Sequence, residues 1–160
     1  MSSLLRAIEF LGLSLWLGSD VFLSFVAAPG AFRILSSRDQ AGAMVGYALG
    51  VMHIGGIICG LVLILARLAR TKTFSSLAAP AALCVVGMIA LTAISEFTVS
   101  PKMAALRAQM GSIQATSADS PLLVQFARLH RVSVSLESAV LLAGIVAMYL
   151  MVRELAFSSL

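Results

Sequence analysis

The chain has 160 residues, of which 60% are hydrophobic and only 11% are charged, and its mean hydropathy is +1.02. A water-soluble domain has about a quarter of its residues charged, so this composition excludes a soluble globular protein and predicts an integral membrane protein. The formal net charge of +4 does not indicate nucleic-acid binding. The basic residues flank apolar runs, where they meet lipid headgroups.

Four apolar stretches are long enough to cross a bilayer, which takes about 20 residues of helix. Backbone groups in lipid must be satisfied within the chain, so these stretches predict an all-α, antiparallel four-helix bundle in the membrane. We expect one domain over 1–160, with a polar loop at about 100–120 between the last two helices. The predicted helices cover about 4–28, 41–67, 76–99 and 121–155.

The first stretch is interpreted as an uncleaved membrane helix. It is too long for a signal peptide, contains Glu9 and Asp20, and lacks a small-x-small cleavage site. We expect the helix to end at Pro29-Gly30, because proline lacks a backbone donor and glycine permits a turn. Arg6 lies one turn from Glu9 and is its expected partner.

The second stretch carries small residues at spacings of three and four, which places them on one helix face. Such a face lets two membrane helices approach closely, so we predict that it packs inside the bundle. His53 lies in the same stripe and is therefore expected to face protein rather than lipid. The predicted packing glycines are Gly42, Gly46, Gly50, Gly56 and Gly60.

Ionisable residues recur in one half of the predicted membrane. With a rise of 1.5 Å per residue, His53 lies about 2 Å, Asp20 about 5 Å and Glu137 about 8 Å from the middle of their apolar runs. Three further groups lie about 13–18 Å from the middle of their apolar runs on the same side. Glu96 is the acid among these groups, and we expect it to pair with Arg131 or Arg128. These three are Glu96, His130 and Arg131.

Ionisable groups inside a membrane are costly and mark functional sites. We therefore expect a polar cavity that binds a small polar ligand or cation, with transport of that ligand as an extension of the same hypothesis. Asp20, His53 and Glu137 are expected to line the cavity, with the other three residues at its mouth. A non-catalytic accessory subunit of a larger membrane complex is the alternative. No catalytic triad or phosphate-binding glycine loop is visible, so we expect no enzyme activity.

Metal and haem chemistry find little support in the spacing. No HxxxH or ExxH motif supplies a metal site, and the identity of any metal or cofactor is left unknown. Haem held between His53 and His130 is disfavoured by an axial separation of about 8–16 Å, although ligation by one histidine stays open. Cys59 and Cys84 lie in apolar runs and are interpreted as packing residues.

The stretches "SFVAAPGAFRIL" (24–35), "VSPKMAALR" (99–107) and "FARLHRVSVSLES" (126–138) resemble the transmembrane protein 205-like family. These are small four-helix membrane proteins with a domain of unknown function. The resemblance implies that His130, with Leu129 and Ser133, belongs to a shared feature. Asp20 and Glu137 depart from the family pattern.

The short loop between the second and third helices, which includes "RLARTK" (67–72), has three basic residues and no acid. By the positive-inside rule, we expect a multi-pass protein of the cell membrane with both termini in the cytoplasm. Expected partners are the lipid bilayer and either further copies of the chain or other membrane subunits, because four helices are few for a self-contained transporter.

Overall fold

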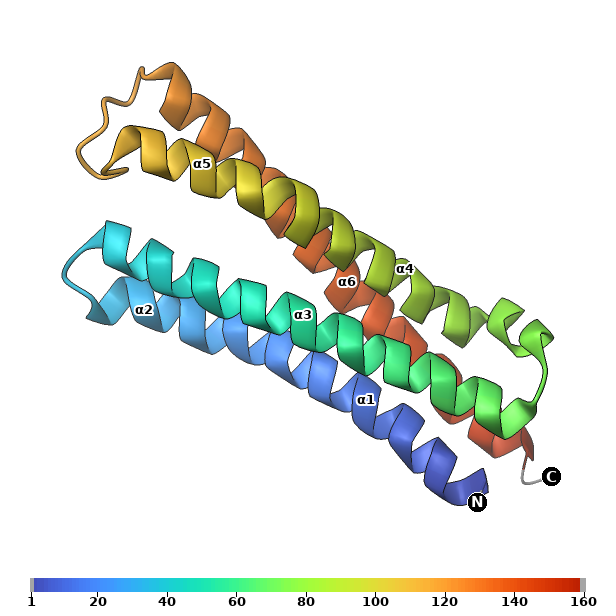
Figure 1. Ribbon diagram of the computed structural model, residues 1–160. Helices are drawn as coiled ribbons and strands as arrows, with labels where there is room; N and C mark the ends of the chain where they lie inside the picture. The colour runs from blue at the N-terminus through green and yellow to red at the C-terminus, as the bar shows by residue number, and fades with distance from the viewer. Residues whose placement is uncertain (1, 159–160) are drawn as a thin grey trace.

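The computed structural model describes residues 2–158 and consists of four long helical spans in an antiparallel bundle (Figure 1). The described part of the chain contains no strand. α1 begins and α6 ends at the same end of the bundle (Figure 1). The elements are α1 (Ser2–Phe22), a π-helical η1 (Leu23–Ala27), α2 (Ala28–Ile34), α3 (Arg38–Thr71), a 3-10 turn η2 (Phe74–Ala78), α4 (Pro80–Ile94), a π-helical η3 (Ser95–Val99), α5 (Ser100–Met110) and α6 (Pro121–Ser158).

All four spans are long and apolar enough to cross a membrane, which confirms the predicted fold class. Only 22–33% of the most apolar window of each span is buried within the bundle. The remaining side chains point outwards and are apolar, as with Phe25 (67% exposed) and Leu142 (64% exposed). An apolar exterior of this extent is stable only against lipid, so this is a multi-pass membrane protein.

The expectation that the first helix ends at Pro29-Gly30 is wrong, because the helix continues to Ile34. A π turn precedes the proline, and the Ala28 amide donates to the carbonyl of Leu23, five residues back. In a regular α-helix the ring of Pro29 would clash with the carbonyl four residues earlier. The extra residue of the π turn changes the hydrogen-bond register just before the proline, so the helix passes through.

The third span repeats this arrangement and also runs past its predicted end at 99. The Ser100 amide donates to the carbonyl of Ser95, and Pro101 follows directly. α4, η3 and α5 thus form one span from Pro80 to Met110. The inserted residue rotates the side chains that follow each π segment by roughly 100° about the helix axis, compared with a regular α-helix.

The core lies in the half of the bundle nearest the chain termini. α1 packs against α3, α4 packs against α6, and the two hairpins meet through α3–α4 and α1–α6 contacts. Trp16 of α1 is the largest buried side chain. It is surrounded by a cluster of aliphatic residues from all four spans: Leu13, Leu63, Ala81, Val85, Met88, Val140, Ala147 and Met151.

Two glycines of α3 make room for Trp16. A Cβ atom on Gly56 would collide with the indole Nε1, and one on Gly60 would lie 2.7 Å from its Cζ3. Gly42 and Gly50 face Arg107 and Glu96, respectively. The prediction that Gly46 packs inside the bundle is wrong. This glycine is exposed, and a Cβ atom added to it would meet open space.

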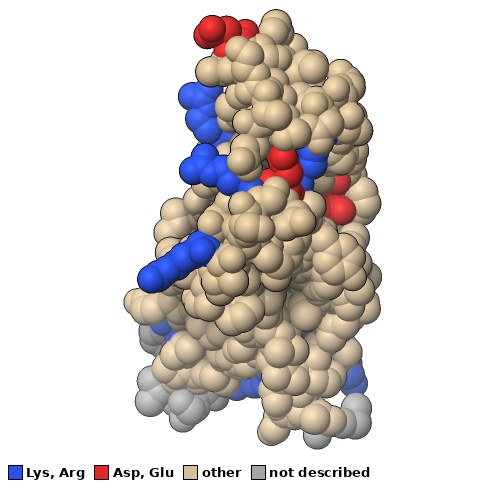
Figure 2. All heavy atoms as spheres, turned by 90° about the vertical axis from the view of Figure 1, so that its left-hand side faces the viewer, with Lys and Arg blue, Asp and Glu red and all other residues tan. Residues whose placement is uncertain are grey.

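Toward the opposite end the two hairpins diverge (Figure 1). There the loop after α5 folds back on the start of α3. Asp39 accepts hydrogen bonds from the Ser112 hydroxyl (2.6 Å) and the Ile113 amide (2.8 Å). Seen from this end, basic side chains lie along one side of the surface, with a few acidic ones among them (Figure 2).

Candidate functional site

A buried histidine joins three spans at the point where the hairpins diverge. His53 lies in the middle of α3 and is fully buried. Its Nδ1 is 2.7 Å from Oε2 of Glu96 on η3, and its Nε2 is 2.5 Å from Oε1 of Glu137 on α6. A protonated imidazole donates from both nitrogens, so an imidazolium between two carboxylates satisfies this geometry.

Asp20 of α1 adds a carboxylate from the fourth span. It is 1% exposed and lies close enough to Glu137 and His53 for charge interactions. Its Oδ1 accepts a hydrogen bond of 3.3 Å from the Ser24 hydroxyl, while its Oδ2 is buried and has no hydrogen-bond partner in the described part of the chain. An unsatisfied buried carboxylate oxygen is costly.

Two buried hydroxyls lie within about one turn of Glu96. Thr92 is 1% exposed and Ser95 is fully buried, and within residues 2–158 neither hydroxyl oxygen has a hydrogen-bond partner. The sequence analysis did not select Ser95, because a serine in an apolar run gives no distinctive signal. Asp20 Oδ2 and these two hydroxyl oxygens are the buried side-chain oxygens that lack a hydrogen-bond partner within residues 2–158.

We call Asp20, His53, Glu96 and Glu137 the His53 cluster. Three ionised carboxylates with one imidazolium would leave two negative charges uncompensated inside the membrane. Desolvating unpaired charges costs several kcal/mol each, roughly. The cluster can reduce this cost by holding protons on its carboxyl groups or by binding a cation.

The two glutamates of the cluster are less buried than its histidine. The side chain of His53 is fully buried, whereas those of Glu96 and Glu137 are 21% and 14% exposed. Both glutamate side chains are thus partly exposed while their carboxylates hold the buried ring. The described residues contain no group of three or more His, Cys, Asp or Glu side chains that could hold a metal ion.

Residues 11–112 match a family described as a domain of unknown function, DUF4149. The chain belongs to the DUF4149 family. Neither a curated protein nor a solved structure matches it. The matched region contains three members of the His53 cluster, Asp20, His53 and Glu96, whereas Glu137 lies beyond it on α6.

In this DUF4149 protein, His130 and Arg131 do not join the cluster. Both are exposed, and among the described residues neither forms an ion pair. His130 shares a helix face with Glu137 but lies about two turns from it along α6. Arg131 points about 120° away from that face. The expected pairing of Glu96 with Arg131 or Arg128 is therefore wrong, because Glu96 is bonded to His53.

Haem ligation by His53 conflicts with this geometry. Both ring nitrogens are held by carboxylates, so axial ligation would require one of these bonds to break. Cys59 and Cys84 are free and half-buried, and they pack against the core cluster.

A second ionic cluster at the opposite end of the DUF4149 bundle escaped the sequence analysis. Glu9, 2% exposed, pairs with Arg70 and Arg67 of α3, whereas the sequence analysis had named only Arg6 as its expected partner. Long arginine side chains reach across helix interfaces, so nearness in sequence does not reveal these two partners. The available signal was the spacing of three between Arg67 and Arg70, which places both near one face of α3.

Proposed function

We propose that this membrane protein binds protons at the His53 cluster and takes up a small monovalent cation in exchange for them. The observation that carries the proposal is a fully buried imidazole bonded to carboxylates from two other spans, with a third buried carboxylate beside it. Such a site favours any species that adds positive charge to it.

The exchange uses atoms already in place. A cation at Asp20 Oδ2 would meet a buried carboxylate oxygen that lacks a partner in the described residues, and its charge would allow a bound proton to leave. Glu96 and Glu137, both bonded to the His53 ring, are the carboxylates that would hold that proton before its release. His53 would hold the two carboxylates in position throughout.

Cation–proton exchange can be measured directly on the purified protein in weakly buffered detergent solution. Addition of Na⁺, K⁺ or Li⁺ should release protons, detected with a pH indicator dye, and Asp20→Asn should reduce the release. The matched control is Asp119→Asn, because Asp119 is an exposed loop residue outside the cluster. Equal proton release from Asp20→Asn and wild type, or none from wild type with any of the three ions, would overturn the proposal.

Transport of the bound ion is a further step of the proposal. Four spans per chain are few for alternating access, so transport would involve a homo-oligomer. The resemblance to the transmembrane protein 205-like family agrees with a four-helix membrane protein, but Asp20 and Glu137 depart from its pattern. The proposed exchange would thus be a property of this chain rather than of that family.

A second candidate function is that of an accessory subunit in a larger membrane complex. Gly46 favours it, since this glycine leaves open space on the exposed face of α3, where another membrane helix could approach closely. In that case the protein would co-purify with a fixed set of other subunits, and Gly46→Leu, but not Asp20→Asn, would release them. We propose the cell membrane and a cytoplasmic location of both termini for either function.

A further inference from the structure

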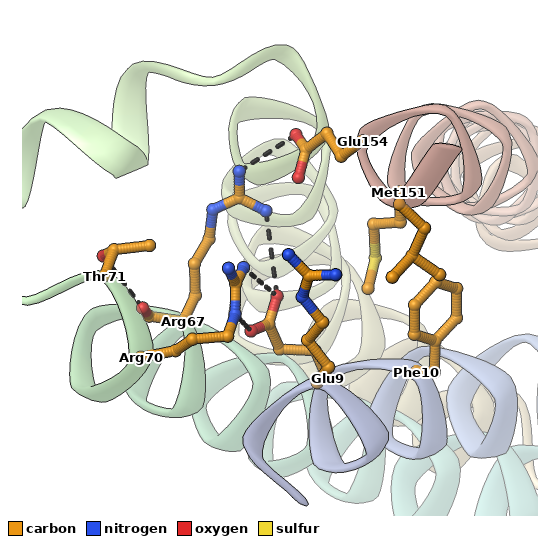
Figure 3. A pocket seen from close by; sticks show the side chains of 9 residues that line it. Glu9, Phe10, Arg67, Arg70, Thr71, Met151 and Glu154 are labelled. Atoms are coloured by element: carbon orange, nitrogen blue, oxygen red, sulfur yellow. Dashed lines mark hydrogen bonds and ion pairs between the residues drawn. The ribbon is translucent and has the colours of Figure 1, made fainter. Parts of the chain in front are cut away.

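A charged pocket lies where α1 begins and where α3 and α6 end (Figure 3). Its volume is about 210 Å³. Three arginines and two glutamates contribute its charged groups, with apolar side chains beside them. The lining residues are Arg6, Glu9, Phe10, Arg67, Arg70, Thr71, Met151, Glu154 and Leu155.

The two arginines of α3 are held by carboxylates from two other spans (Figure 3). Arg70 donates to both oxygens of Glu9, from Nε at 2.6 Å and from Nη2 at 3.1 Å. Arg67 donates from Nη2 to Glu154 at 2.9 Å and from Nε to the carbonyl of Ser76 at 3.1 Å. These bonds fix the direction of both guanidinium groups.

The two glutamates differ in how firmly they are held. The side chain of Glu9 is 3% exposed and pairs with both Arg67 and Arg70, whereas that of Glu154 is 37% exposed and pairs with Arg67. Surface carboxylates exchange readily with solvent and contribute little to stability. Glu154 is thus the partner that an incoming anion would displace from Arg67.

Charge and position point to the kind of anion. Three guanidinium groups face two carboxylates, so the pocket is positive, and it becomes more so when Glu154 leaves. Guanidinium groups bind phosphate oxygens in bidentate fashion. The pocket lies at the ends of membrane helices, the level of lipid headgroups, where basic pockets between helices bind anionic lipids.

We propose that this pocket, which we call the arginine pocket, binds a phosphate group. Arg67 and Arg70 would contact its oxygens, Arg6 would add charge, and Glu154 would swing away. The same chemistry serves an anionic phospholipid headgroup and free phosphate. The apolar side chains of Phe10 and Met151 at the pocket wall (Figure 3) favour the lipid.

The test is native mass spectrometry of delipidated, folded protein titrated with phosphatidylglycerol or phosphatidylcholine of matched acyl chains. Inorganic phosphate is titrated in a separate arm, followed by thermal stability. Wild type should bind phosphatidylglycerol about fivefold or more tightly than phosphatidylcholine, since each basic residue at a membrane surface is worth about 1 kcal/mol toward anionic lipid. Stabilisation by phosphate without a lipid preference would assign the site to free phosphate.

Variants separate anion binding from a structural ion network. Arg6→Gln and Arg70→Gln should each weaken phosphatidylglycerol binding about fivefold, and Glu154→Gln should strengthen it. Lys72→Gln is the matched control, since Lys72 is an exposed basic residue next to α3 and outside the pocket. Equal binding of both lipids with no effect of phosphate would overturn the proposal. So would an unchanged or weaker affinity in folded Glu154→Gln, whatever the fate of the arginine variants.

Discussion

Nε2 of His53 lies 2.5 Å from Oε1 of Glu137, across 84 residues of sequence. This contact joins the first hairpin to the second inside the membrane, and the bond from Nδ1 of the same ring to Glu96 doubles the connection. The His53 cluster is therefore both the candidate binding site and a polar link between the two halves of the bundle.

Replacing His53 by alanine should destabilise the protein by about 3 kcal/mol, because it leaves two largely buried carboxylates without their partner. Chemical unfolding in detergent micelles, followed by circular dichroism, measures the loss. The triple variant His53→Leu, Glu96→Gln, Glu137→Gln should recover most of it by removing the unpaired charges. If His53→Ala unfolds like wild type, the imidazole does not neutralise the carboxylates.

Gly56→Ala should cost about 1–3 kcal/mol through overpacking. The added methyl group would lie 2.8 Å from Cδ1 of Trp16, whose side chain is buried in the core and cannot retreat. Gly46→Ala is the matched control on the same helix, where the methyl group meets open space. Thermal unfolding of the two variants side by side should show a loss only for Gly56→Ala, and equal loss in both would contradict the packing described.

Glu9→Gln should destabilise the end of the bundle at which α1 begins, by about 3 kcal/mol, since it leaves the buried arginines partly unpaired. A double-mutant cycle with Arg70→Gln should give a coupling energy of about 1–3 kcal/mol. The same cycle between Glu9 and Lys72 should give none. Additive effects of Glu9→Gln and Arg70→Gln would show that the two-bond pairing is absent.

Asp39→Ala should loosen the loop after α5 without affecting the His53 cluster. The substitution removes the acceptor for the Ser112 hydroxyl and the Ile113 amide. Hydrogen exchange at Ile113 should accelerate and proteolysis should occur near Gly111, which has a positive φ of 68°. Unchanged exchange at Ile113 would mean that other contacts hold the loop.

The sequence supports predictions of axial position better than predictions of pairing. The helical rise per residue predicted that Asp20, His53 and Glu137 lie in the same half of the membrane, and the structure brings these side chains together. The same reasoning put Glu96 level with Arg131, but depth does not specify the helix face. The π turn at Ser95–Val99, which changes the face that follows, has no recognised signal in the sequence except the proline after it.

The divergence of the two hairpins could not be predicted from the sequence either. His130 has the spacing of an interior residue, yet it is exposed. The ion pairs of Glu9 are a second example of contacts that depend on how the helices pack. Its nearest basic residue in sequence is Arg6, yet packing of α1 against α3 brings Arg70 within bonding distance. Helix-to-helix geometry decided both outcomes.

The most direct test of the central claim uses the small number of histidines. The chain has two, so in His130→Gln protein labelled with ¹⁵N-histidine every imidazole signal belongs to His53. Both ring ¹⁵N resonances should shift on Glu137→Gln and on Glu96→Gln, and again when a monovalent cation is added to protein that retains Asp20. Resonances that stay unchanged in both glutamine variants would contradict the His53 cluster and the function built on it.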